Sequence, residues 1–489
     1  MPELLTSLDL FSIAKGERQY SPPPNSKTIC SASSDALQDY LSQKSSQLLY
    51  GIDTGFGPHA FQNNEDRLEN QKSLVYHLTV SDFKDRLSHI EARAVLCARI
   101  HSLSQGGSGI SWELLELLMT LLEIDCIPVI PAKGSLSASG DLIPLSAIAL
   151  SLMGEGLWTG KGHPSGPTIH NDKKSEVTGL PRVLQPKEAI SLTNGTSFST
   201  ALLSIQLEST HRLHDFILDQ LETLFRFHSV FADAFFPALH KTKRHSGPIQ
   251  IANRLYSIVS KNSKTKIEGK RIQDIYSIRC IPQILGSILD ELDGIRLSVE
   301  NELNSLSDNP VYIEEEKRFV EGGNFYASQV SFAADRLQNC LAVLATWIER
   351  FIQYLYNPTE NNDFPLMLSP QPGRYAGLSG IGLLATHLTA DIRRDSMPGS
   401  VQSLSSNGGN QDIVPMGAIS ILRNRRSLDS LNTLVSILTY SIFQAGTLKG
   451  FHFPKDSIYT NLVPLKSDAR LDGELAKIKS LFTTYSPFE

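Results

Sequence analysis

The sequence Lys133-Gly-Ser-Leu-Ser-Ala-Ser-Gly-Asp-Leu-Ile-Pro-Leu-Ser146 is the most informative stretch of this 489-residue chain. It follows an apolar segment and is crowded with glycine, serine and alanine. Small residues at this density predict a tight turn. Asp141 then stands where it would cap a helix that begins near Leu142. In this simplest interpretation, Gly140 only relieves strain in the main chain.

The same turn also has a chemical interpretation. If the turn is compressed, the amide nitrogen of Gly140 can attack the carbonyl carbon of Ala138, and a side chain at position 140 would obstruct that approach. Closing the ring releases one water, and loss of the Ser139 hydroxyl releases a second. The product carries an exocyclic methylene conjugated with the ring, and it is an electrophile that no standard side chain provides.

The block from Gly134 to Leu145 resembles the loop that carries 4-methylidene-imidazole-5-one (MIO) in the aromatic amino acid ammonia-lyase and aminomutase family. This family includes histidine, phenylalanine and tyrosine lyases, and the resemblance extends over most of the chain. It implies that Ala138, Ser139 and Gly140 form MIO autocatalytically, without a metal or a nucleotide. It also implies an all-α bundle of long helices of the fumarase/aspartase-like lyase type, assembled as a homotetramer whose active sites draw on three chains.

The composition argues against several other classes of protein. The chain is 41% hydrophobic and 20% charged, as soluble globular proteins are, and its net charge of −6 without a long basic run argues against a nucleic-acid partner. Five scattered cysteines form no C-x-x-C pair, which indicates reduced thiols and a cytoplasmic location. We see no signal peptide, and the uncharged runs 189–207 and 430–448 contain polar residues, so we expect buried helices and no membrane span.

Helical periodicity dominates the chain, and nothing predicts a strand-rich domain. The segments predicted as helical are 88–103, 111–124, 191–240, 285–303 and one that ends near Tyr356. We expect an MIO-bearing region (1–190), a central bundle of long helices (191–357) and a C-terminal helical region (358–489). Sites are expected in the clefts between helices and between subunits.

The segment Tyr50-Gly-Ile-Asp-Thr-Gly-Phe-Gly-Pro58 predicts a flexible loop. Asp53-Thr54-Gly55 also occurs in aspartic proteases, but their fold needs a β-rich chain with a second such motif or a small dimer. The whole loop resembles the family's Tyr-Gly-x-x-Thr-Gly-Phe-Gly loop, whose tyrosine is the catalytic base. The resemblance therefore implies that Tyr50 is the base, and its pKa of about 10 must be lowered for action near neutral pH.

His77 and Leu78 occupy the positions that lie near the substrate ring in the family. A His-Leu pair resembles the tyrosine enzymes, Phe-Leu the phenylalanine enzymes and Ser-His the histidine enzymes. The resemblance implies that His77 binds a phenolic hydroxyl and that Leu78 packs against the ring, although a lone histidine is more often structural. The chain departs from the family at residues 79–85, which lack the expected glycines, and at Ala147, where many relatives carry histidine.

Gln273, Tyr276 and Arg279 recur at three-residue steps, which places them on one side of a helix or turn. The planar donor fork of Arg279 suits a carboxylate, and a structural salt bridge is the alternative. The surrounding block resembles the family's Gln-Asp-x-Tyr-Ser-x-Arg-Cys-x-Pro-Gln. This resemblance implies that Arg279 binds the substrate carboxylate and that Tyr276 orients the amine side.

Four more residues are assigned to substrate binding by the resemblance: Asn194, Phe325, Asn410 and Gln411. Asn194 would bind near the MIO ring and orient the amine side, although it could also be a helix cap. Phe325 matches a pocket position but could equally belong to the core. Asn410 would help to hold the carboxylate. Histidine lyases carry a glutamate at the position of Gln411, so the Asn-Gln pair speaks against histidine as substrate.

These features favour MIO-dependent elimination of ammonia from an aromatic L-amino acid, with L-tyrosine giving trans-p-coumarate as the first choice. A tyrosine 2,3-aminomutase giving β-tyrosine would use the same residues, and phenylalanine or histidine ammonia-lyase activity is a further alternative. A non-catalytic helical scaffold is the alternative from another class. His211 and His214 lack further ligands nearby in sequence, so we expect a solvated face there and no metal site.

Overall fold

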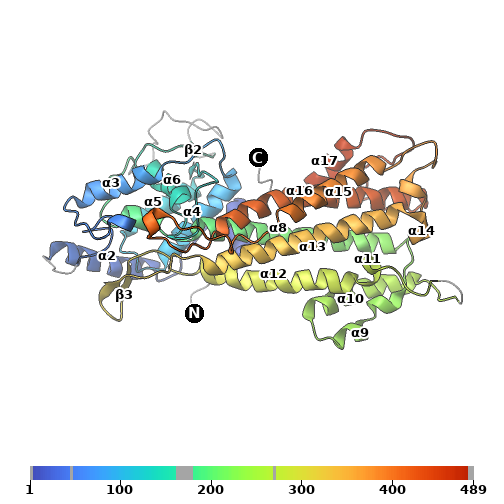
Figure 1. Ribbon diagram of the computed structural model, residues 1–489, viewed down its shortest axis with the longest axis horizontal. Helices are drawn as coiled ribbons and strands as arrows, with labels where there is room; N and C mark the ends of the chain where they lie inside the picture. The colour runs from blue at the N-terminus through green and yellow to red at the C-terminus, as the bar shows by residue number, and fades with distance from the viewer. Residues whose placement is uncertain (1–3, 44–47, 161–179, 268–270, 483–489) are drawn as a thin grey trace.

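The computed structural model describes residues 4–43, 48–160, 180–267 and 271–482. Long helices run side by side along the longest axis of the molecule, and the N-terminal helices gather at one end of it (Figure 1). The predicted all-α bundle is confirmed. The hydrophobic core is continuous between the long helices and the N-terminal helices, and the predicted division into three regions stays a prediction.

The bundle consists of α8 (Ser197–Phe225), α12 (Ile281–Leu303), α13 (Ser328–Tyr356), α15 (Ser379–Arg394) and α16 (Gly417–Leu448). α13 packs between α12 and α16, and α8 contacts both α12 and α16. The apolar stripe of α12 is buried as its 3–4 spacing predicts. Each large apolar side chain buried in this way contributes about 1.5–3 kcal/mol. α13 ends before Pro358, which cannot continue a helix.

The N-terminal end contains α1 (Ser7–Ala14), α2 (Ser26–Ser42), α3 (Arg67–Leu78), α4 (His89–Ser104), α5 (Trp112–Glu123), α6 (Leu142–Leu152) and α7 (Glu188–Thr193). α4 lies at its centre, packed against α1, α5 and α8, and is buried on nearly every face. Its first turn is closed by a capping box between Ser88 and Glu91. The predicted helices at 88–103 and 111–124 are confirmed as α4 and α5.

The remaining elements are short, apart from α10 (Ser246–Val259) and α17 (Asp472–Phe482). The short α-helices are α9 (Pro237–Lys241), α11 (Tyr276–Arg279) and α14 (Pro358–Asn361). The 3₁₀ turns are η1 (Gly57–His59), η2 (Ala232–Phe235), η3 (Ser260–Asn262), η4 (Leu366–Leu368) and η5 (Asn407–Gly409). β1 (Ile127–Pro128) pairs with β2 (Trp158–Thr159), and β3 (Val311–Ile313) pairs with β4 (Arg318–Val320), both antiparallel.

The helical pattern predicted from residue 191 to about residue 240 is confirmed only in part. α7 ends at Thr193, α8 begins at Ser197, and α8 ends at Phe225. Gly195, in the gap, has a φ of +143°, a conformation that a helix cannot contain. The interruption matters because it brings the side chain of Asn194 and the main chain of Gly195 against the Ala138–Gly140 turn.

The solvated face predicted for His211 and His214 is also wrong. His214 is buried, and its Nε2 lies 3.0 Å from the carbonyl oxygen of Leu285, so it joins α8 to α12. In the described part of the chain, no group of three metal-ligating side chains occurs. The helices described here include none that is long and apolar enough to cross a membrane.

Candidate active site

The turn that carries Ser139 is tied to the start of α13. The amide nitrogen of Gly140 donates to the carbonyl oxygen of Phe325 at 3.1 Å, and the amide of Ala327 donates to the carbonyl oxygen of Ser137 at 3.1 Å. Ser137 has a φ of +56°, which is unfavourable for a residue with a side chain. The surrounding hydrogen bonds therefore hold this turn in a conformation that it would not adopt alone.

Two predicted site residues bind Ser139 directly. Gln411 Nε2 donates to the Ser139 hydroxyl at 2.7 Å, and Asn194 Nδ2 donates to the Ser139 carbonyl oxygen at 2.9 Å. The Oδ1 of Asn194 is buried and has no hydrogen-bond partner among the described residues. Ser406 donates to the Oε1 of Gln411 at 2.9 Å, which fixes the amide with its donor toward Ser139.

Gly140 packs directly against Gly195. Its φ of +74° lies in the left-handed region, and a Cβ at this position would overlap the main-chain nitrogen of Gly195. The next amide, that of Asp141, donates to the Gly195 carbonyl oxygen at 2.7 Å. Glycine at position 140 is therefore required both by the main-chain conformation and by the contact with Gly195.

Asp141 precedes α6, but its predicted role as a side-chain cap is wrong. Its buried carboxylate accepts hydrogen bonds from the Ser135 hydroxyl at 2.6 Å and from the Ser199 hydroxyl and amide at 2.7 and 2.9 Å. Burial raises the pKa of Asp141, and these donors oppose the rise. The carboxylate thus joins the turn to the first turn of α8.

Tyr50 lies on a loop that packs against the loop carrying Gln411. The Tyr50 hydroxyl accepts a hydrogen bond from the amide of Gly57 at 3.0 Å. A Cβ at Gly57 would lie 2.7 Å from the Asn407 side-chain nitrogen, so the two loops are in contact. Burial raises the pKa of Tyr50, and the Gly57 amide opposes this effect. Within a single copy of the chain, the predicted lowering of the Tyr50 pKa is therefore wrong.

Asp53 anchors the Tyr50 loop. Its carboxylate pairs with Arg67 at 2.7 and 3.0 Å and accepts the Leu49 amide at 3.1 Å and the Tyr40 hydroxyl. Burial alone would raise the pKa of Asp53, but these donors hold it below the usual value. This carboxylate is fully engaged in positioning the loop, which argues against the aspartic-protease alternative.

His77 and Leu78 end helix α3. His77 is exposed, and its Nδ1 lies 3.3 Å from the Ser73 carbonyl oxygen, whereas Leu78 is buried in the core. Segment 79–85, where the sequence differs from the family pattern, runs beside the residues that precede the Ser139 turn. The amide of Ala132 donates to the Asp85 carbonyl oxygen at 2.9 Å, so this segment is anchored to the residues that lead into the turn.

Gln273, Tyr276 and Arg279 share one surface, as their spacing predicts. The Arg279 guanidinium lies 4.5 Å from the centre of the Tyr276 ring and donates to the Gln273 side-chain oxygen. α11, which carries Tyr276 and Arg279, lies toward the opposite end of the bundle from α6 (Figure 1). One chain therefore does not bring Arg279 to Ser139.

Comparisons with known proteins show the family of this chain. The family model described as aromatic amino acid lyase matches residues 5–460. The chain belongs to the aromatic amino acid lyase family. A tyrosine ammonia-lyase from Cupriavidus metallidurans is 32% identical over 475 residues, which cover 91% of this chain and 87% of that protein. A histidine ammonia-lyase from Bacillus velezensis is 33% identical, covering 82% of this chain and 78% of that protein.

Solved structures of this family superpose on nearly the whole chain. A phenylalanine aminomutase from Pantoea agglomerans has a TM-score of 0.89 and 26% identity, covering 99% of this chain and 98% of that one. A tyrosine aminomutase from Streptomyces globisporus has a TM-score of 0.89 and 27% identity, covering 98% and 95%. This lyase-family protein is an enzyme of the ammonia-lyase and aminomutase group, so the scaffold alternative loses support.

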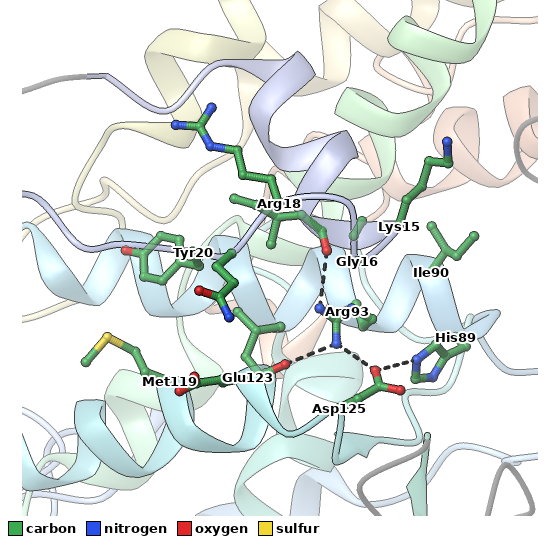
Figure 2. A pocket seen from close by; sticks show the side chains of 14 residues that line it. Lys15, Gly16, Arg18, Tyr20, His89, Ile90, Arg93, Met119, Glu123 and Asp125 are labelled. Atoms are coloured by element: carbon green, nitrogen blue, oxygen red, sulfur yellow. Dashed lines mark hydrogen bonds and ion pairs between the residues drawn. The ribbon is translucent and has the colours of Figure 1, made fainter.

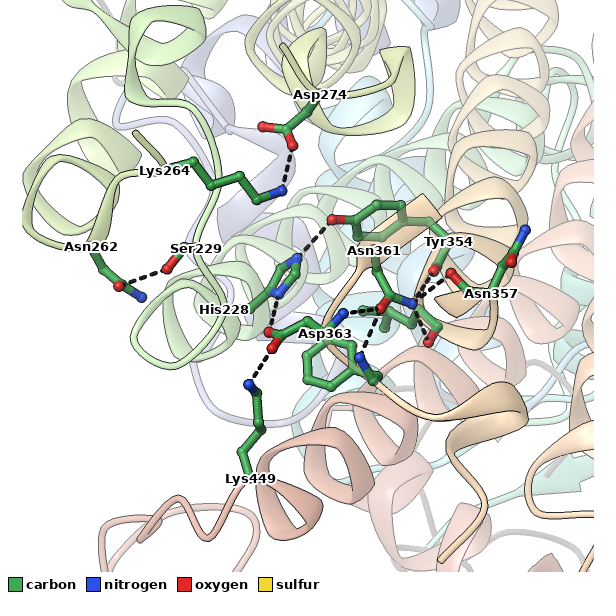
Figure 3. A network of polar contacts seen from close by, with 12 residues as sticks. His228, Ser229, Asn262, Lys264, Asp274, Tyr354, Asn357, Asn361, Asp363 and Lys449 are labelled. Carbon is green, nitrogen blue, oxygen red and sulfur yellow. Dashed lines mark hydrogen bonds and ion pairs between the residues drawn. The ribbon is translucent and has the colours of Figure 1, made fainter. Parts of the chain in front are cut away.

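In this aromatic amino acid lyase, hydrogen bonds and an ion pair fix the segment that carries Arg279 (Figure 3). Asp274 accepts the Phe231 amide at 2.7 Å and pairs with Lys264 at 2.8 Å. The Trp347 indole donates to the Ser277 carbonyl oxygen at 2.9 Å. Because these bonds fix the main chain on both sides of Tyr276, the exposed side chains of α11 are presented in one orientation.

A second buried network supports the same end of the bundle (Figure 3). The ring of His228 bridges Asp363 Oδ2 at 2.8 Å and the Tyr354 hydroxyl at 2.7 Å. Burial lowers the pKa of His228, although Asp363 opposes this effect. The histidine therefore joins α8, α13 and the segment after α14 into one unit.

The structure places Phe325 beside the Ser139 turn and Asn410 on the loop that carries Gln411. Phe325 is half-buried, and its main-chain oxygen is the group that binds the turn. Asn410 is exposed beside η5. The sequence interpretation missed the contacts of Ser137, Gly195 and Arg99. For Arg99 the available signal was a charge that directly follows the apolar run Ala94–Ala98.

A cavity of about 560 Å³ lies apart from this site, between the end of α1, α4 and α5 (Figure 2). None of the predicted site residues lines it. In its wall, Asp125 binds Arg93 at 2.6 Å and His89 at 2.8 Å. We assign it no part in the reaction.

Proposed function

We propose that this enzyme eliminates ammonia from an aromatic L-amino acid, with L-tyrosine as the preferred substrate and trans-p-coumarate as the product. The observation that carries the proposal is the binding of Ser139 by both Gln411 and Asn194. These two amides come from distant parts of the chain and surround one residue of a constrained turn. A turn that served only to start α6 would not need donors on both its hydroxyl and its carbonyl.

The turn has the features that formation of MIO from Ala138, Ser139 and Gly140 requires. Gly140 carries no Cβ beside the nitrogen that must attack, and Gly195 leaves no room for one. The Asn194 donor lies on the Ser139 carbonyl oxygen, which becomes the ring carbonyl, where it would withdraw electrons. Once formed, MIO supplies an electrophile that takes up the substrate amine and makes it a better leaving group.

The chain's own residues perform the remaining tasks. The β-proton of the substrate is weakly acidic, and Tyr50 in its deprotonated form removes it. The Gly57 amide, which already binds the Tyr50 oxygen, stabilises the phenolate. Arg279 and Asn410 bind the substrate carboxylate, and Asn194 and Tyr276 orient the amine side. His77 binds the phenolic hydroxyl. The remaining residues line the substrate pocket: Leu78, Gln273, Phe325 and Gln411.

The proposal requires more than one copy of the chain, because α11, which carries Arg279, lies toward the opposite end of the bundle from α6 (Figure 1). We propose the homotetramer that the family resemblance implies. A second copy of the chain would supply α11 to the site. The exposed apolar surface beside α11 supports this arrangement: Tyr276 is 69% exposed, Val343 is 50% exposed, and both line a cavity of about 510 Å³. We also propose a cytoplasmic location, since all five cysteines are free.

A tyrosine 2,3-aminomutase is the second candidate, and the likeness to two aminomutase structures favours it. The test is to incubate the purified protein separately with L-tyrosine, L-phenylalanine and L-histidine and to identify the products by mass spectrometry. Coumarate and ammonia from tyrosine support the lyase, and β-tyrosine supports the aminomutase. Turnover of histidine alone would contradict the assignment of His77 and Gln411.

A further inference from the structure

Arg99 is a fully buried arginine near the Ser139 turn. It lies on α4 with 0% of its surface exposed. Its Nη1 lies 3.4 Å from the Ser197 hydroxyl, and its Nε and Nη2 have no hydrogen-bond partner among the described residues. Burying a cation with so few partners is unfavourable. Its position is therefore fixed by the surrounding packing and not by a direct ion pair.

The charges around Arg99 are bound elsewhere. Asp308 pairs with the buried Lys187 at 2.9 Å, and Asp141 accepts hydrogen bonds from serines. Burial lowers the pKa of Arg99 to about 10, while Asp308 and Asp141 oppose that shift. The guanidinium is thus a charged, planar and rigid group at neutral pH.

Arg99 touches the residue against which Gly140 packs. A Cβ at Gly195 would overlap the Arg99 Nη1, and a Cβ at Gly140 would overlap the Gly195 nitrogen. The Arg99 guanidinium therefore contacts the Gly195 main chain, and the Gly195 main chain contacts the Gly140 main chain. The order of these contacts leaves Gly195 no space to withdraw from Gly140 while Arg99 stays in place.

We propose that Arg99 is a positioning residue for formation of MIO. Its guanidinium packs against Gly195, and Gly195 in turn holds the Gly140 nitrogen close to the Ala138 carbonyl carbon. The inference rests on the proposed function, because it assumes that the ring forms from Ala138, Ser139 and Gly140. It adds a residue that contacts neither substrate nor the reacting atoms.

The step that Arg99 assists is balanced without an oxidant. A bond forms between the Gly140 nitrogen and the Ala138 carbonyl carbon. The Ala138 oxygen leaves as water with the hydrogens of the Gly140 and Ser139 amides, and a C=N bond remains. The second water takes the Ser139 hydroxyl and the Ser139 α-hydrogen, which leaves the methylene. The first step depends on the approach of two main-chain groups, and such approaches are sensitive to displacements of about 1 Å.

The experiment compares R99K and R99M with the control R93M. Arg93 is also a buried arginine of α4, but it binds Asp125 and the Leu122 carbonyl oxygen and does not touch the turn. Intact mass is followed at intervals after synthesis, with circular dichroism as a check of folding. We expect R93M to lose two waters at the wild-type rate and R99M to lose them about tenfold to hundredfold more slowly. R99K should fall between them.

A double-mutant cycle keeps the test decisive if R99M folds poorly. G195A places a Cβ against the guanidinium, so it should slow dehydration as well. If the two residues act through their contact, G195A/R99K should be no slower than the slower single variant. Dehydration of R99M or R99K at the R93M rate, or fully additive effects in the cycle, would overturn the inference. Wild-type protein that loses no water would instead overturn the proposed function.

Discussion

The side-chain amide of Gln411 donates a hydrogen bond of 2.7 Å to the hydroxyl of Ser139, across 272 residues of sequence. This contact joins the loop before α16 to the loop before α6, and it fixes the side of Ser139 from which the hydroxyl would depart. The loop that carries Tyr50 packs against the same loop before α16, where Gly57 lies against Asn407. The loop that carries Gln411 and Asn407 therefore contacts both the Ser139 turn and the Tyr50 loop.

The first prediction concerns this amide. Q411E replaces the donor to Ser139 by a carboxylate, which cannot donate when ionised. Before MIO forms, this partly buried hydrogen bond positions the Ser139 hydroxyl, and its loss costs about 1–3 kcal/mol. Q411E should therefore lose the two waters about tenfold or more slowly, and kcat/KM for tyrosine should fall with the unconverted fraction. Preference should shift toward histidine. The control is Q402E, in the same segment, whose side chain binds only the Pro398 carbonyl oxygen. Equal kcat/KM values in Q411E and Q402E would refute this role.

Tyr50 gives a prediction about pH. Burial raises the pKa of Tyr50, so the deprotonated fraction is small at neutral pH and grows about tenfold per pH unit. If the phenolate is the base, log kcat/KM should rise between about pH 7 and pH 9. Y50F should lose turnover while it keeps the two-water mass loss. A flat profile over this range, or a Y50F variant as active as wild type, would show that another group is the base.

Substrate choice is tested at His77. A buried phenol recognised by an imidazole should favour tyrosine over phenylalanine by about one to two powers of ten. H77F removes the polar partner, so the ratio of kcat/KM for the two substrates should move toward phenylalanine. Y76F is the matched control, since Tyr76 precedes His77 on α3 and binds Glu155 at 2.7 Å. If H77F and Y76F leave the ratio equally unchanged, His77 does not contact the substrate ring.

The shared site is tested by mixing inactive chains. S139A should lack the electrophile, and R279A should lose the anchor for the substrate carboxylate. When both variants are co-expressed, hybrid sites that combine an intact Ser139 with an intact Arg279 from another chain should reach about a quarter of the total. Activity should therefore reappear in the mixture. Co-purified hybrids without any activity would contradict a site built from several copies.

Much of the fold could be predicted from the sequence because helical periodicity is a local property. The stripe on α12 and the end of α13 at Tyr356 were both predicted, since apolar spacing and proline act within a few residues. A break at Gly195 itself was not predicted, because the surrounding residues keep a helical pattern and Asn194 was given only as a possible cap. Only the contact with Gly140 explains why the chain leaves the helix there.

The site could be predicted only in part for the same reason. The motifs around Ser139 and Gln411 were recognisable separately, but their contact depends on packing between distant segments. Asp141 was mistaken for a helix cap because its partner Ser199 lies on another helix. The effect of burial on the Tyr50 pKa is likewise set by three-dimensional surroundings that no short motif contains.

The most direct test of the central claim is the intact mass of the purified wild-type protein. The account predicts a mass lower than that of the translated sequence by two waters, located by peptide mapping to Ala138-Ser139-Gly140. S139A has no side-chain hydroxyl and should not show the full loss. An unmodified wild-type mass from folded protein would contradict the electrophile, and with it the proposed reaction.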